Sequence, residues 1–133
     1  MQLVLKREQS SKGLMSKSVV FVLNARADLS EEEKHNVEKY KLGPQVIYNS
    51  EASRKHLEAG SNSGTAGSIA RLALARMSLN ISVDSLQRGH AINCSTLDEV
   101  LGAEEAIKDA CESLKTYLEI AETFDGRQEV IDY

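Results

Sequence analysis

The sequence has few of the features that mark secreted or membrane-spanning proteins. Among its 133 residues there is no Trp, 5% are aromatic, two are Cys and one is Pro. No apolar run approaches the roughly 20 residues that cross a bilayer, and the opening MQLVLKREQ reaches charged residues after three apolar ones. We therefore expect no membrane span and no secretory signal. Without an export signal, we expect a cytoplasmic protein in which Cys94 and Cys111 stay reduced and largely buried.

The sequence also lacks an excess of positive charge. Lys and Arg number 16 against 20 Asp and Glu, which gives a formal net charge of -4. Because phosphate neutralisation needs a clustered basic surface, nucleic acid is not an expected partner. The remaining composition, 41% hydrophobic and 27% charged, is typical of a globular protein. The length suits a single domain over residues 1–133, and its core must be mainly aliphatic because aromatic residues are scarce.

Alternation and turn residues predict several short strands. We expect strands at residues 2–6, 19–27 and 45–49, with a loop over residues 10–18. Two more short strands are expected around Gly89, joined by residues 84–88. The last residues, RQEVIDY, are expected to return as a terminal strand. Two of these connections look like hairpins, so the sheet should be mostly antiparallel.

Capping signals mark the helices. Ser30 with Glu33 forms a capping box, and Gly43 followed by Pro44 should end that helix. Residues 66–79 are expected to form a second, apolar helix with Arg71 and Arg76 among its few polar positions. Such a helix must be buried on more than one side, either inside the domain or against another copy of the chain.

The strongest pattern lies in the last third of the chain. Thr96 and Glu99 form another capping box, and Gly126 is a natural stop after Asp125. Between them, apolar residues recur at alternating spacings of three and four, a heptad-type stripe. Its eight members are Val100, Ala103, Ile107, Ala110, Leu114, Tyr117, Ala121 and Phe124, widened on one side by Leu97, Leu101, Cys111 and Leu118. A helix from Thr96 to Asp125 would be about 45 Å long, so it crosses the whole domain or overhangs it.

These elements predict an α+β fold. A small, mostly antiparallel sheet should pack against the long C-terminal helix and the second apolar helix. We expect Leu114, Tyr117 and Leu118 to be contact residues, either in the core or across a subunit boundary.

A glycine- and serine-rich stretch, EAGSNSGTAGSIARLALAR at residues 58–76, is the main candidate for a ligand site. Its spacing is neither the dinucleotide fingerprint nor a P-loop. Residues 60–67 are read either as a surface loop with no ligand or as an anion site at a helix N-terminus. For the anion site, the candidate donors and cations are Arg54, Lys55, Gly64, Thr65, Gly67, Ser68, Arg71 and Arg76.

Catalytic and metal-binding patterns are not found in the sequence. His35, His56 and His90 lie in separate segments. His90 and Cys94 would be about 13 Å apart in a strand, too far to share a metal. No cysteine has a neighbouring sequence that marks an activated thiol. We therefore predict no catalytic residues, no metal site and no cofactor.

Two function hypotheses remain, and they belong to different classes. The leading hypothesis is a non-enzymatic cytoplasmic protein that forms a homodimer or higher oligomer and works by binding another macromolecule, an unidentified protein. Its basis is the hydrophobic surface of the two apolar helices, which a thin sheet does not easily cover. The alternative is a small-ligand protein that binds a phosphate-bearing metabolite or nucleotide signal at the loop 60–67.

Overall fold

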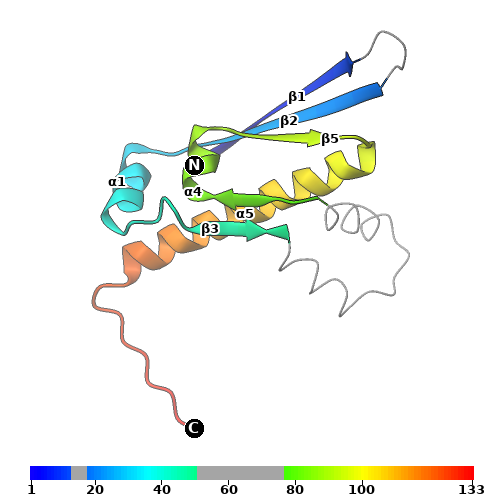
Figure 1. Ribbon diagram of the computed structural model, residues 1–133. Coiled ribbons are helices and arrows are strands. Elements are labelled where there is room, and N and C mark those ends of the chain that lie inside the picture. The colour runs from blue at the N-terminus through cyan, green and yellow to red at the C-terminus, as the bar shows by residue number, and fades with distance from the viewer. Residues whose placement is uncertain (13–17, 51–76) are drawn as a thin grey trace.

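The protein is an α+β fold built around one long helix. The computed structural model describes residues 1–12, 18–50 and 77–133, and every structural statement below concerns these residues. In chain order they form β1 (Gln2–Lys12), β2 (Ser18–Asp28), α1 (Glu31–Lys39), β3 (Val46–Asn49), β4 (Asn80–Ser82), α4 (Val83–Arg88), β5 (His90–Cys94) and α5 (Leu97–Thr123). Figure 1 shows α5 running the length of the domain beside the strands.

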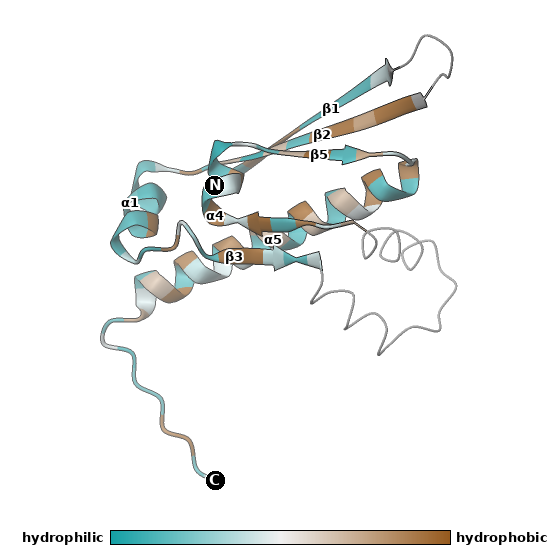
Figure 2. Ribbon diagram, in the orientation of Figure 1, coloured by the Kyte–Doolittle hydropathy of each residue, from teal (hydrophilic) through white to brown (hydrophobic). Residues whose placement is uncertain are grey.

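Strands β1, β2 and β5 form one antiparallel sheet in the order β1-β2-β5. The two long strands pair over their whole length, from Gln2 opposite Asp28 to Lys12 opposite Ser18. The expected loop over residues 10–18 is therefore wrong at its start, because β1 continues to Lys12. The second half of β1 is polar. It is extended because it pairs with the β-branched and aromatic residues near the start of β2. Figure 2 shows this contrast, with a hydrophobic end of β2 beside a hydrophilic β1.

Helix α1 confirms the predicted capping box but ends earlier than predicted. The Glu33 amide donates to the Ser30 hydroxyl, and the Ser30 amide donates to the Glu33 carboxylate. The helix ends at Lys39, and Lys41 adopts a left-handed conformation with φ 55°. The amides of Lys41 and Leu42 donate back to the carbonyls of Glu38 and Val37, which is a Schellman motif. The stop is therefore at Lys41 and not at Gly43.

The segment before α5 also differs from the prediction. The two strands on either side of residues 83–88 exist, but that connection is the helix α4, capped by Ser82 and ending at Gly89 with φ 106°. The strands do not pair with each other. Strand β4 pairs with β3, and β5 pairs with β2.

Two further predictions, the second apolar helix and the terminal strand, differ from the structure in the residues that it describes. Residues 66–76 of the second apolar helix lie outside the described part, and residues 77–79 are not helical. The Leu79 amide instead donates to the Ser50 hydroxyl, which extends the pairing of the β3–β4 pair. The expected terminal strand is wrong, because residues 124–133 form no strand and are exposed.

The long C-terminal helix is confirmed as a single unbroken element. It packs against both sheets and against α1. Its buried residues are Gly102, Ala103, Ala106, Ile107, Ala110, Cys111, Leu114, Leu118 and Ala121. Leu23, Ile81, Leu86 and Ile92 complete the centre of an aliphatic core. The predicted α+β fold, with a small antiparallel sheet packed against a long C-terminal helix, is confirmed. The strands form two sheets instead of one, and residues 66–76 of the predicted second apolar helix lie outside the described residues.

Candidate functional site

The residues that the sequence nominates fall into two groups. Arg54, Lys55, Gly64, Thr65, Gly67, Ser68, Arg71 and Arg76 all lie outside the described residues. The phosphate or nucleotide site at loop 60–67 therefore stays a prediction.

The three nominated contact residues lie on α5. Leu114 is fully buried and Leu118 nearly so, both in the core of the subunit. Tyr117 is partly buried against that core, and the Gln45 side-chain amide lies 3.5 Å from its hydroxyl. Of the two roles left open by the sequence, the structure places Leu114 and Leu118 in the core. These two leucines are therefore not available for a contact with another molecule.

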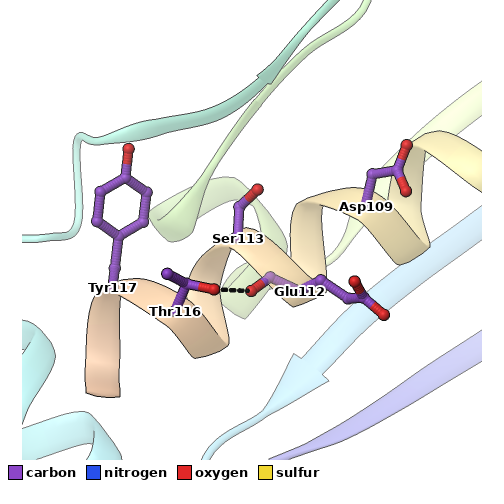
Figure 3. A pocket seen from close by; sticks show the side chains of 5 residues that line it. All are labelled: Asp109, Glu112, Ser113, Thr116 and Tyr117. Carbon is purple, nitrogen blue, oxygen red and sulfur yellow. Dashed lines mark hydrogen bonds between the residues drawn. The ribbon is translucent and has the colours of Figure 1, made fainter. Parts of the chain in front are cut away.

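One hollow lies on the outer face of α5. A cavity of about 520 Å³ is lined by Asp109, Glu112, Ser113, Thr116 and Tyr117. In Figure 3 all five side chains come from this one helix, and the carboxylates of Asp109 and Glu112 do not point toward each other. The Thr116 hydroxyl donates to the Glu112 carbonyl at 3.0 Å and so is already satisfied by its own helix. Among the described residues, all the side chains that line this hollow belong to α5.

A second hollow separates β5 from the segment before β4. It has a volume of about 380 Å³, and its polar lining includes Ser78, His90, Asn93, Ser95 and Glu99. Burial lowers the pKa of His90. Burial also raises the pKa of the Cys94 thiol, with a smaller contribution from Glu99. A thiol whose pKa is raised is a poor nucleophile, so this arrangement does not activate Cys94.

Burial likewise raises the pKa of the other cysteine, Cys111. Both cysteines are free and buried. Among residues 1–12, 18–50 and 77–133, no group of three or more His, Cys, Asp or Glu side chains is placed to hold a metal ion. Within the same ranges, none of the helices has the length and hydrophobicity needed to traverse a lipid bilayer.

The third hollow has an apolar centre and is formed by β1, β2 and α5. It is a groove of about 320 Å³ between the β1–β2 hairpin and the beginning of α5. Phe21, Leu23, Leu97 and Val100 provide its apolar lining, and Arg7, Glu8, Gln9 and Val22 complete it. We call this hollow the hairpin groove.

The sheet register explains why the hairpin groove exists. Strand β5 covers β2 only from Phe21 to Ala25, so the first residues of β2 and the end of β1 extend past it. Arg7 and Gln9 lie opposite Leu23 and Phe21, so these four side chains share one face of the hairpin. An ion pair between Arg7 and Glu104 joins that face to α5. The hairpin therefore overhangs the start of the helix and leaves a hollow beneath it.

Capping fixes the helical side of the groove. The Glu99 amide donates to the Thr96 hydroxyl, as predicted, but the Glu99 carboxylate accepts from the Ser95 amide instead of the Thr96 amide. Leu97 follows as the first helical residue and is 66% exposed. Leu101, one turn later, is also exposed. These two leucines extend the apolar surface of the groove along α5.

Comparison with known protein families, with curated proteins and with solved structures finds no match to this chain. The function must therefore be inferred from the residues themselves. Sequence reasoning missed the groove because Phe21 and Leu97 are 76 positions apart and meet only through the fold. The sequence does contain one indication of this surface. Leu97 and Leu101 lie one turn apart beside the heptad stripe, and they make the apolar face of the helix wider than the buried stripe.

Proposed function

We propose that this chain is a cytoplasmic, non-enzymatic protein that self-associates and acts by binding another macromolecule. The observation that carries the proposal is the hairpin groove together with Leu97 and Leu101, an exposed apolar surface formed by the β1–β2 hairpin and α5. The buried centre of a protein–protein interface is enriched in apolar and aromatic side chains and is surrounded by a polar rim. The two free, buried cysteines fit a reducing compartment.

The position of this surface favours an association of folded subunits. Most of the apolar stripe of α5 is covered by the sheets of its own subunit. Leu97 and Leu101 belong to the first turns of the helix and contribute little to that core. A contact made through them would therefore join subunits that are already stable.

The oligomeric state tests the proposal. We expect light scattering at high micromolar concentration to give the mass of a dimer or higher oligomer. The double variant Leu97→Glu with Leu101→Glu should shift the protein toward the monomer, because charge in an apolar contact is strongly disfavoured. A matched control is Val46→Glu, which places a charge at another exposed apolar residue, on β3. A wild-type protein that remains monomeric at these concentrations would overturn the proposal.

A further inference from the structure

The residues that follow α5 form a segment outside any helix or strand that carries two adjacent β-branched residues. Residues 124–133, here called the C-terminal segment, form no helix or strand and leave the body of the domain (Figure 1). Val130 and Ile131 within it are 78% and 58% exposed. Val and Ile favour extended structure, and neither contacts a core in its own subunit. The segment therefore carries apolar residues that its own subunit does not cover.

The hairpin groove of the same subunit is at the limit of reach for these two residues. Val100 and Thr123 are 23 residues apart on one helix, which is about 35 Å at 1.5 Å per residue. Val130 and Ile131 follow Thr123 by seven and eight residues, and even a fully extended chain of that length spans only about 25–29 Å. A contact within one copy would need the whole segment to turn back and run fully extended along α5, so we take the groove of a second copy as the partner.

We propose that the C-terminal segment of one copy binds in the hairpin groove of a second copy. Val130 and Ile131 would contact Phe21, Leu97 and Val100, and Leu101 would be covered in the same contact. This inference rests on the proposed self-association and specifies its surfaces.

Charge at the rim of the groove supports the same partner. The C-terminal segment contains Glu129 and Asp132 beside its apolar pair. Arg7 lies on β1, at the edge of the sheet, and lines the groove beside Glu8. Its ion pair with Glu104 uses the guanidinium Nε, and the Arg7 side chain is 58% exposed while that of Glu104 is 16% exposed. The other guanidinium donors of Arg7 are able to bind an incoming carboxylate without breaking this pair.

A closed dimer satisfies both grooves at once. The hairpin groove lies at the beginning of α5 and the C-terminal segment follows its end (Figure 1). If two copies align their α5 helices antiparallel, the beginning of each helix lies beside the end of the other. A two-fold axis then relates two identical contacts, which limits the assembly to a dimer instead of an open fibre.

Disulfide trapping between two differently tagged variants tests the contact. We would mix full-length Leu97→Cys with full-length Val130→Cys under mild oxidation and measure the tagged heterodimer. We expect heterodimer from this mixture at least tenfold above that from Val46→Cys mixed with Val130→Cys. Wild type mixed with Val130→Cys is a second control, in which the buried Cys94 and Cys111 should give no heterodimer. Equal trapping in all mixtures would overturn the proposal.

A second variant separates this inference from the proposed function. Val130→Asp with Ile131→Asp changes only exposed residues, so at a concentration where both proteins are monomeric its unfolding midpoint should equal that of the wild type. We expect its dimer dissociation constant to be weakened about tenfold or more. A wild type that is monomeric would refute self-association itself. A wild type and double variant that associate equally well would refute only the role of the C-terminal segment.

Discussion

Gly43 lies at a close approach between two segments. Its carbonyl accepts from the Asp84 amide at 2.8 Å, which holds the end of α1 against the start of α4. A Cβ atom at this position would overlap the Asp84 carboxylate, with the carboxylate carbon at 2.9 Å. The glycine predicted to end α1 instead lies where the chain passes close to the start of α4, at a residue 41 positions away.

We predict that Gly43→Ala lowers the free energy of unfolding by no more than about 1 kcal/mol, because the overlapping atoms are the end of the exposed Asp84 side chain, which can rotate away. Asp84→Ala alone should cost only a few tenths of a kcal/mol through the loss of a carboxylate in the first turn of α4. In the double variant the overlap is gone, so most of the cost of Gly43→Ala should disappear. Urea unfolding of the four proteins measures this coupling. If Gly43→Ala costs the same with and without Asp84, the overlap is not its cause.

His90 should make the stability depend on pH. It lies on β5 opposite Ala25, and burial lowers its pKa below the ordinary value of 6.5. The unfolded chain then binds a proton at a higher pH than the folded chain, so stability rises with pH in this range. Above pH 6.5 His90 is neutral in both states and does not reduce the free energy of unfolding. As the pH falls below 6.5 the free energy of unfolding decreases, and the decrease stops below the pKa of His90 in the folded protein.

We therefore expect His90→Gln to flatten the decline in unfolding free energy between about pH 8 and pH 5. Urea unfolding at several pH values measures the decline in both proteins. Carboxylates act in a different window, because the pKa of Asp28, lowered by its hydrogen bond to Arg26, lies below 3.8. Parallel curves for wild type and variant above pH 5 would show that His90 is not the cause.

At the scale of the element, α5 is a core helix with an exposed apolar edge at its beginning. We predict that Leu114→Ala lowers the free energy of unfolding by about 2–5 kcal/mol, because it leaves a cavity where the side chain is fully buried. The matched variant Leu101→Ala removes the same atoms from an exposed position of the same helix. In the monomer it should change stability by no more than about 0.5 kcal/mol. Urea unfolding at low protein concentration compares the two variants. Equal losses of unfolding free energy would contradict the assignment of Leu114 to the core and Leu101 to the surface.

Elements with strong local signals were predicted well. The capped beginning of α5 and its apolar period are contained in residues 96–124, so its existence and start follow from that stretch alone. Helix α4 was missed because six residues provide less than two turns of pattern. The far half of β1 was missed because its polar residues have no strand preference of their own and are extended by pairing with β2.

At the scale of the whole molecule, both sheets pack on the same helix. Strands β2 and β5 contact α5, and so does β3 of the second sheet. A long apolar helix in a small domain is thereby mostly covered without a second copy. The surfaces left for assembly are then at the two ends of α5: the hairpin groove at its beginning, and the C-terminal segment after its end. This arrangement is why we place the proposed contacts at the helix ends and not along its centre.

The sequence by itself determined the α+β class, the starts of α1 and α5, and the aliphatic nature of the core. These follow from caps and periodicity, which act between residues within a few turns or alternate along one strand. Only the tertiary structure decided which strands pair, where β1 ends, which apolar residues of α5 are buried and that Phe21 meets Leu97. Those features depend on contacts between residues far apart in the chain, whose free energy is gained only when the separate elements pack together.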